Sequence, residues 1–273
     1  MYEAAAAQAV VEQTSNKQHM MNKALVCSLA FTLLVVSGNA LAETPAFDRP
    51  GIAFSTSTIP RGGLSYELGL PDFQHSSDAG SKSTLYSLDT NIRAGLGENI
   101  ELQLATPLFN YLKTEGAGFS DSATGLGDSS LSLKVALPSS SQNFSWAGLA
   151  GVTFATGEDP FTAGKPQYRL ATAMSLKLND TYSTGFYINL NHFDGKTSYT
   201  LSPNLNFALT DSVGAYVEAG FSHVDQSPNT AVAGGGLAWM VAPSVQLDFS
   251  MDFGLTHDSP DFLGGFGVSF FIK

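Results

Sequence analysis

Residues 245–255 read VQLDFSMDFGL, a segment in which apolar side chains alternate with polar or small ones. One set of alternate positions holds the apolar residues Val245, Leu247, Phe249, Met251, Phe253 and Leu255. The intervening positions hold Gln246, Asp248, Ser250, Asp252 and Gly254. Successive side chains of a β-strand point to opposite faces of the sheet, so this period of two indicates a strand with one apolar and one polar face.

The same alternation recurs along the chain and predicts twelve strands. They span residues 64–70, 84–96, 100–107, 128–137, 144–155, 168–178, 182–193, 198–209, 213–223, 231–241, 245–255 and 262–272. Most are longer than the roughly five or six residues usual in soluble proteins and close to the ~9–11 residues that a tilted membrane strand needs. We therefore expect an all-β fold, a twelve-stranded antiparallel transmembrane β-barrel over residues 63–273.

The composition agrees with a barrel whose outer face meets lipid. Of the 273 residues, 43% are hydrophobic and only 14% are charged, against roughly 25% charged in ordinary soluble domains. The polar face of the predicted strands is mainly Ser, Asn, Gly and Thr, which suits a wet lumen. Thirteen basic against 24 acidic residues give a formal charge of −11. Without a basic stripe to neutralise phosphates, a nucleic-acid partner is not expected.

The first 42 residues are predicted to be removed on export. Asn22-Lys23 supplies a short positive region, residues 24–36 are apolar, and Ala40-Leu41-Ala42 is a small-x-small cleavage site. We interpret residues 21–42 as a signal peptide and residues 1–20 as an upstream extension. The lone Cys27 lies within the removed segment, so the mature chain has no thiol for a disulfide or a metal.

Residues 43–62 precede the first predicted strand and are rich in Pro, Ser and Thr. They are either a loose lead or a plug that folds into the lumen. Ile52, Phe54 and Ile59 are apolar residues that need cover, which favours the plug.

Connection lengths indicate the orientation of the barrel. Shorter connections are predicted at 97–99, 138–143, 179–181, 210–212 and 242–244, and longer ones at 71–83, 108–127, 156–167, 194–197, 224–230 and 256–261. Outer-membrane barrels have short periplasmic turns and longer outer loops. An even number of strands then places both ends of the barrel on the periplasmic side, in a Gram-negative-type outer membrane.

Ten ionisable residues are predicted to line the lumen: Glu67, Asp89, Arg93, Glu101, Lys134, Arg169, Lys177, Glu218, Asp248 and Asp252. Closing the sheet would place a basic wall opposite an acidic one. The electric field between two such walls orients dipolar solutes in a pore. The alternative is a set of lumenal ion pairs that rigidify or plug the barrel, because a lone buried charge is costly. Gly234, Gly236, Gly265 and Gly267 flank the carboxylates of the strand 245–255, either leaving space for solute or permitting bends.

No catalytic or cofactor motif stands out. The histidines show no ligand spacing such as His-x-x-x-His, so no metal site is expected. Ser222 and His223 are adjacent, which places their side chains on opposite faces of a strand and disfavours an esterase. We expect neither enzyme activity nor a cofactor.

The beginning of the predicted mature chain carries a family resemblance. It reads Asp48-Arg49-Pro50-Gly51, then Phe54-Ser55, Ser57-Thr58, Pro60, Gly63, Glu67, Gly69 and Leu70-Pro71. With Gly125-Leu126-Gly127-Asp128 and Thr156-Gly157, the chain resembles the outer-membrane transporter family named from the phenol meta-cleavage degradation pathway. Ala155 stands where a proline is expected before Thr-Gly. The resemblance implies a membrane barrel that passes hydrophobic or aromatic compounds.

These observations predict an outer-membrane channel for passive passage of small solutes, including hydrophobic or aromatic ones. The alternative is a closed structural or adhesive barrel that acts through its surface loops. The expected partners are outer-membrane lipid, a small-molecule solute and the outer-membrane insertion machinery, which would read the aromatic-rich last strand at 262–272.

Overall fold

The computed structural model describes residues 46–273. The predicted upstream extension at 1–20 and signal peptide at 21–42 lie outside the described residues, as do residues 43–45. Within the described part of the chain, no helix is long and apolar enough to cross a membrane.

Residues 46–273 contain thirteen strands. They are β1 (Leu64–Asp78), β2 (Ser81–Gly95), β3 (Ile100–Gly116), β4 (Phe119–Gly125), β5 (Ser129–Leu137), β6 (Phe144–Phe154), β7 (Gln167–Lys177), β8 (Tyr182–Phe193), β9 (Lys196–Ala208), β10 (Val213–Val224), β11 (Thr230–Ala242), β12 (Val245–Gly254) and β13 (Phe262–Ile272).

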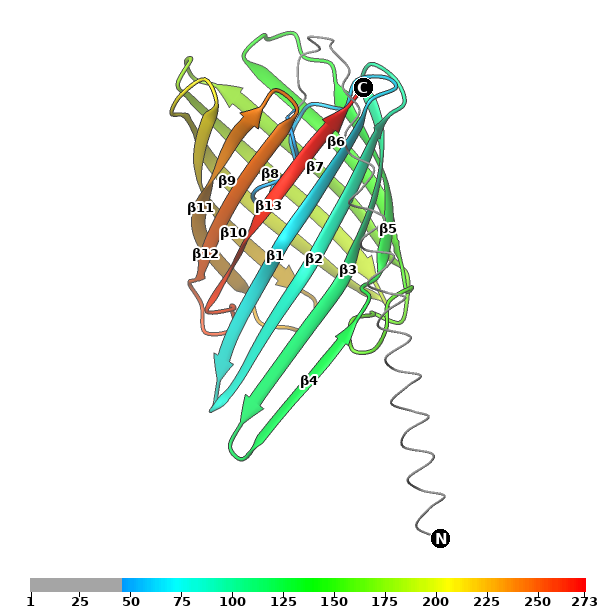
Figure 1. Cartoon of the computed structure of the whole chain (residues 1–273), viewed down its shortest axis with the longest axis vertical. Helices are drawn as coiled ribbons and strands as arrows, with labels where there is room; N and C mark the ends of the chain where they lie inside the picture. The colour runs from blue at the N-terminus through cyan, green and yellow to red at the C-terminus, as the bar shows by residue number, and fades with distance from the viewer. Residues whose placement is uncertain (1–45) are drawn as a thin grey trace. The chain divides into compact units, whose positions relative to one another are not determined.

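Twelve of these strands close into an antiparallel barrel, as predicted (Figure 1). β1 pairs with both β2 and β13, which closes the ring between the first and last strands. β3 pairs with β5 over residues 100–105 and then with β4 over residues 110–116. The short strand β4 is therefore an extension of the β5 position, and the ring runs β1, β2, β3, β5 and on in order to β13.

The two faces of each strand have the expected environments. On β12, Gln246, Asp248 and Asp252 are buried inside the barrel, whereas Leu247 and Phe253 are exposed on its outer face. A closed sheet leaves no backbone edge unpaired, which is the condition for spanning lipid with strands. The exposed apolar residues thus form the lipid-facing surface of a transmembrane barrel.

The prediction is wrong for three of the six connections that were expected to be long. Residues 71–83 and 194–197 reduce to two-residue turns at 79–80 and 194–195, because the flanking strands continue further than predicted. Residues 108–127 contain the end of β3, a two-residue turn at 117–118, the strand β4, which was not predicted, and the start of the break before β5. Strand pairing needs only backbone hydrogen bonds, so the ladder continues through polar stretches such as the pair Ser76 and Ser83. The alternation of apolar residues therefore indicates only the part of a strand that faces lipid.

The hairpin turns have the backbone geometry of tight β-turns. Ala79 and Gly80 have φ of 46° and 82°, and Asp194 and Gly195 have φ of 47° and 74°. Two positive φ values in a two-residue loop are typical of a type I′ turn, whose twist matches that of the paired strands.

The break between β4 and β5 explains the glycine motif that carried the family resemblance. A Cβ on Gly127 would lie 2.6 Å from Pro107 Cγ, and one on Gly157 would lie 2.9 Å from the Gly127 carbonyl carbon. The Asp128 carboxylate accepts hydrogen bonds from the backbone N–H groups of Gly157 at 2.9 Å and Ala163 at 2.8 Å. The two glycines allow this close approach, and Asp128 then fixes the loop at residues 155–166.

Burial would raise the pKa of Asp128, but the N–H groups of Ala163 and Gly157 outweigh it and hold the pKa below its ordinary value. The group is therefore ionised at neutral pH. Its contribution to loop order is complete above the ordinary pKa of an aspartate and is lost as the pH falls through the lowered one.

Replacing Asp128 by alanine removes both acceptors from the loop. We expect chymotrypsin to cleave the folded barrel after Phe161, within the loop that Asp128 fixes, several-fold faster in Asp128→Ala than in the wild type, because the loop opens locally more often. Asp211→Ala, at an exposed turn, is the control for loss of one carboxylate. Equal cleavage rates in all three proteins would contradict this role for Asp128.

Candidate functional site

Residues 46–62, here called the N-terminal segment, form no strand and lie inside the barrel. Phe54 is buried against Ala147, Leu149, Ala171, Ala173 and Tyr187, with its ring edge-on to Tyr187 at 5.6 Å between centroids. Alanines at these inward positions of β6 and β7 leave the volume that Phe54 fills. Phe47 and Ile59 form a second buried cluster with Phe271 on β13.

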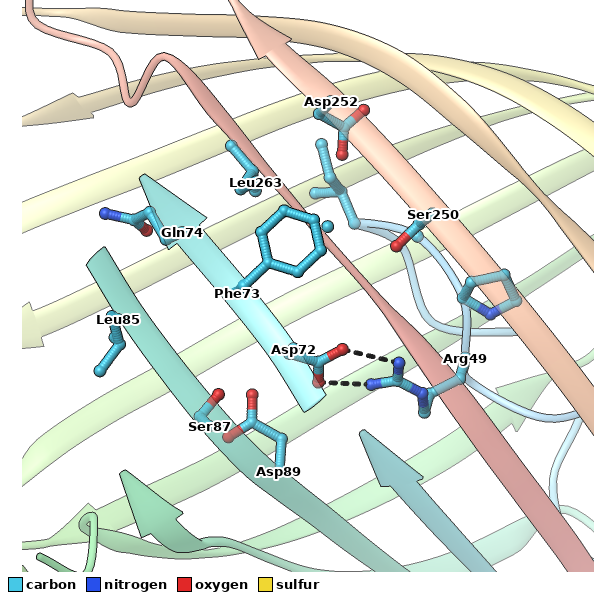
Figure 2. Close-up of a pocket in the computed structure, with 14 residues that line it drawn as sticks. Arg49, Asp72, Phe73, Gln74, Leu85, Ser87, Asp89, Ser250, Asp252 and Leu263 are labelled. Atoms are coloured by element: carbon cyan, nitrogen blue, oxygen red, sulfur yellow. Dashed lines mark hydrogen bonds and ion pairs between the residues drawn. The ribbon is translucent and has the colours of Figure 1, made fainter. Parts of the chain in front are cut away.

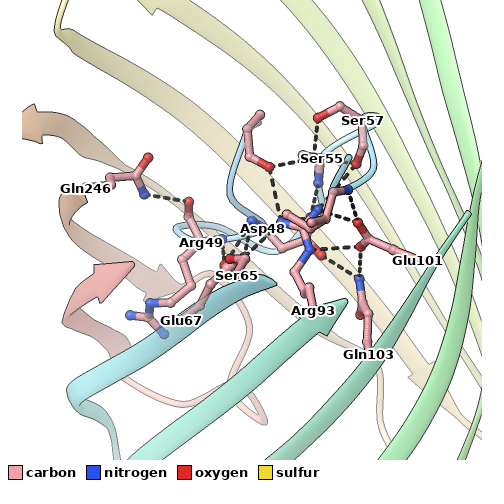
Figure 3. A network of polar contacts seen from close by, with 12 residues as sticks. Asp48, Arg49, Ser55, Ser57, Ser65, Glu67, Arg93, Glu101, Gln103 and Gln246 are labelled. Atoms are coloured by element: carbon pink, nitrogen blue, oxygen red, sulfur yellow. Dashed lines mark hydrogen bonds and ion pairs between the residues drawn. The ribbon is translucent and has the colours of Figure 1, made fainter. Parts of the chain in front are cut away.

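Four of the predicted lumen residues meet on neighbouring strands, and Figure 3 labels three of them, Glu67, Arg93 and Glu101. Glu67, Arg93, Glu101 and Lys134 come from β1, β2, β3 and β5 in that order, and each is at most 1% exposed. Arg93 binds Glu67 through Nη1 at 2.8 Å and Glu101 through Nε at 2.8 Å. Bases and acids therefore alternate across adjacent strands and neutralise one another.

Asp48 of the N-terminal segment completes this network. Its Oδ1 lies 2.8 Å from Lys134 Nζ and 3.3 Å from Arg93 Nη1, and its Oδ2 accepts a hydrogen bond from Gln103 at 2.8 Å. Lys134 also lies 3.5 Å from Glu101. We call Asp48, Glu67, Arg93, Glu101 and Lys134 the buried charge network.

Wall carboxylates also bind the backbone of the N-terminal segment. Glu67 accepts hydrogen bonds from the N–H groups of Asp48 and Arg49, at 2.9 Å each to Oε2. Glu101 accepts one from Ile59 at 2.5 Å, and Glu218 on β10 accepts one from Ile52 at 3.0 Å. A segment without strand pairing thus obtains partners for N–H groups that would otherwise be buried and unsatisfied.

Arg49 attaches the segment to β1 and β12, beside the strands of the network. Its guanidinium makes two parallel hydrogen bonds to Asp72 on β1, at 2.7 and 2.8 Å, and lies 3.3 Å from Asp248 on β12. Two-point contact of this kind is strong and directional. We call Arg49, Asp72 and Asp248 the arginine clamp.

The glycines that flank these carboxylates hold space for side chains of the protein itself. A Cβ on Gly267 would lie 2.4 Å from Arg49 Nε, and one on Gly265 would lie 2.2 Å from Asp72 Oδ1. On β11, a Cβ on Gly234 would lie 2.5 Å from Asp252 Oδ1, and one on Gly236 would lie 2.8 Å from Tyr216 Oη. The space beside each glycine is occupied.

The other predicted lumen residues are distributed differently. Arg169 points inward and donates to Asn189 Oδ1 at 3.0 Å. Asp89 and Asp252 line an inner cavity. Lys177 lies apart from all of them, exposed at the end of β7 and paired with Asp180 at 2.7 Å. The expected basic wall facing an acidic wall is not what the described residues form, because the bases Arg93 and Lys134 are interleaved with acids.

Three charged residues that hold the segment were not among the predicted site residues: Asp48, Arg49 and Asp72. All lie outside the predicted strands, in stretches where alternation gives no inward or outward assignment. The available signal was the run Asp48-Arg49-Pro50-Gly51, which carried the family resemblance without indicating contacts.

Three cavities lie in the lumen around the N-terminal segment, with volumes of about 320, 370 and 280 Å³. The first is lined by residues near the β1–β2 hairpin and the 255–261 loop (Figure 2). The third is lined by Asn204 and Asn206 at the end of β9 and by Tyr216 at the start of β10, towards the other end of the barrel. Gly51 lines all three, so the segment lies between cavities at the two ends.

The serine and histidine that the sequence placed side by side have separate partners. Ser222 shares a hydrogen bond with Thr200 at 3.0 Å, and His223 Nδ1 lies 2.6 Å from Asn229 Oδ1. Among residues 46–273, no group of three or more His, Cys, Asp or Glu side chains is placed to hold a metal ion.

Solved structures share this fold at low sequence identity. An outer-membrane channel from Pseudomonas putida F1 superposes with a TM-score of 0.59 at 12% identity, covering 82% of this chain and 99% of that one. The NanC porin superposes with a TM-score of 0.50 at 7% identity, covering 76% of this chain and 98% of that one. No curated protein matches the chain by sequence. The likenesses establish the outer-membrane barrel fold.

A family model matches residues 47–272, which is nearly all of the part that the structure describes. The match begins within the N-terminal segment and ends at the last residue of β13, so it includes both the barrel wall and the segment inside it. The chain therefore belongs to the family described as "Putative MetA-pathway of phenol degradation".

Proposed function

We propose that this protein is an outer-membrane channel for the passive passage of small solutes, with the N-terminal segment as its internal plug. The observation that carries the proposal is the pair of cavities at opposite ends of a closed barrel, separated by the segment. A lumen lined by charged, amide and hydroxyl groups is wettable, whereas a structural barrel of this size gains more from an apolar core.

The contacts of the plug favour a constriction that can open. Much of its attachment is polar, through the buried charge network, the arginine clamp and Glu218. Water entering the lumen can replace such contacts one at a time, at a lower cost than exposing a continuous apolar core. Solute passage then requires the segment to shift between the two cavities.

The solute class that we propose is small and partly hydrophobic, including aromatic compounds. The cavity towards the 255–261 loop combines apolar surface from Ile52, Leu85 and Leu263 with carboxylates. The family description, a pathway of phenol degradation, is consistent with aromatic solutes. No part of this mechanism needs a cofactor or a catalytic group.

Export and insertion follow from the same proposal. The predicted signal peptide at 21–42 would direct the chain out of the cytoplasm, and β13, with Phe262, Phe266, Phe270 and Phe271, would be the strand read by the insertion machinery. Lipid would contact the exposed apolar face of the barrel.

A closed structural or adhesive barrel is the second candidate. The observation that favours it is the way that β1–β2 and β3–β4 continue as long hairpins beyond the rest of the wall, which Figure 1 shows on one side of the barrel. Such hairpins could contact other surfaces while the plug stays in place. Recording from planar bilayers separates the two candidates, because only a channel produces current steps.

Removing the plug should widen the path. We expect a variant lacking residues 43–60 to show a single-channel conductance several-fold above that of the full mature chain in planar bilayers. Deletion also leaves Arg93 and Lys134 with one acid fewer, so folding must be checked by the heat-dependent mobility of the barrel in gels. An unchanged conductance in folded protein would rule out the segment as the constriction.

Weakening the arginine clamp should also favour the open channel, with a smaller effect than deletion of the plug. We expect Arg49→Gln to raise the frequency of open events without changing the fully open conductance, because both ion pairs of Arg49 hold the closed position. Arg61→Gln is the matched control, since Arg61 belongs to the same segment and is exposed. If the two variants gate alike, the clamp does not hold the plug.

A further inference from the structure

The cavity towards the 255–261 loop has an unbalanced charge. Asp72, Asp89 and Asp252 line it, and the only basic residue among its lining residues is Arg49 (Figure 2). With all four groups ionised, the lining carries a formal charge of −2. The volume of about 320 Å³ lies at the lower end of the range for small-molecule pockets.

Arg49 is already committed to other carboxylates. Its guanidinium pairs with Asp72 through two hydrogen bonds and with Asp248 through a third contact. No basic side chain of the described residues comes within salt-bridge distance of Asp89 or Asp252. Asp252 therefore faces the cavity without a countercharge, whereas Asp89 shares side-chain hydrogen bonds with Asp72 and Ser87 and has no ion pair of its own.

Asp252 supplies the observation that points to a ligand. It is only 4% exposed, and its Oδ1 has no hydrogen-bond partner among the described residues. In Figure 2 the Asp252 carboxylate projects from β12 towards the space bordered by Ser250 and Phe73. A buried, unsatisfied carboxylate oxygen costs free energy unless a donor or a cation reaches it.

The rest of the lining is suited to an apolar group. Ile52, Phe73, Leu85 and Leu263 contribute side chains around the same space, and Figure 2 shows Phe73 between the Asp72–Asp89 side and Asp252. A ligand that satisfies both sets of groups has one positive end and one apolar body.

We propose that this cavity is a binding subsite for small organic cations, namely a primary ammonium attached to an apolar or aromatic body, with Asp252 and Asp89 as the ammonium acceptors. This rests on the proposed channel function, within which the subsite selects the solutes that approach the plug from the 255–261 loop side. The ammonium donates to the unpartnered Asp252 oxygen, and the body packs against Phe73, Leu85 and Leu263. Charge-assisted hydrogen bonds of this type are about twice as strong as neutral ones.

Calorimetric titration of the full mature chain, refolded in detergent, tests the subsite without relying on conduction. The probes are benzylamine at neutral pH, where it is an ammonium ion, and benzyl alcohol as its neutral counterpart. We expect benzylammonium to bind and benzyl alcohol to bind far more weakly. Asp252→Asn and Asp89→Asn, each nearly isosteric, should weaken benzylammonium binding roughly tenfold or more. Asp211→Asn, which removes a carboxylate at an exposed turn, should bind as the wild type does.

Three results would overturn the proposal: no benzylammonium binding to the wild type, equal binding of the alcohol, or unchanged binding in both Asp252→Asn and Asp89→Asn. Current recordings on the same preparations keep the two proposals apart. Current steps without benzylammonium binding would leave the channel standing and remove the subsite. Binding that depends on Asp252 in a barrel that never conducts would remove the channel.

Discussion

Arg93 and Lys134 are fully buried inside the barrel, and the need to neutralise them organises the lumen around them. Each base is held between carboxylates of neighbouring strands and Asp48 of the N-terminal segment. Removing one partner of such a pair typically costs about 3–5 kcal/mol, because the remaining charge stays buried. The segment is therefore an electrostatic component of the barrel interior as well as a filler of its volume.

This constraint connects the fold to the proposed function. The charge network binds Asp48 on the β2–β5 side, and the arginine clamp binds Arg49 to β1 and β12. Two adjacent residues of the segment thus contact different parts of the wall with opposite charges. A segment held by discrete polar contacts at both sides can divide the lumen into cavities and still be displaced without unfolding the wall. The unpartnered Asp252 lies beyond the clamp, on the side of the cavity near the 255–261 loop.

The strand pattern was predictable because lipid imposes a strict environment. Leu247 and Phe253 on β12 must face lipid, and Asp248 and Asp252 must avoid it. Apolar and polar residues therefore alternate along the strand. The polar ends of β1, β2 and β3 have no such constraint, since water accepts either face. For that reason the long hairpins appeared as loops in the alternation pattern. The role of the glycines of β11 and β13 was not predictable, because the sequence does not show which side chain packs against a residue that lacks a Cβ atom.

The sequence by itself determined the all-β fold, the number of strands in the ring, which face of each strand meets lipid, and the membership of the family, because these depend on local periodicity and on short motifs. Only the tertiary structure decided that Arg93 lies between Glu67 and Glu101, that Arg49 reaches Asp72 and Asp248, and that Asp252 is left without a partner. Arg49 and Asp248 are 199 residues apart in the chain. Contacts of that kind depend on closure of the ring and on where an irregular segment settles inside it, and neither is encoded in a local pattern.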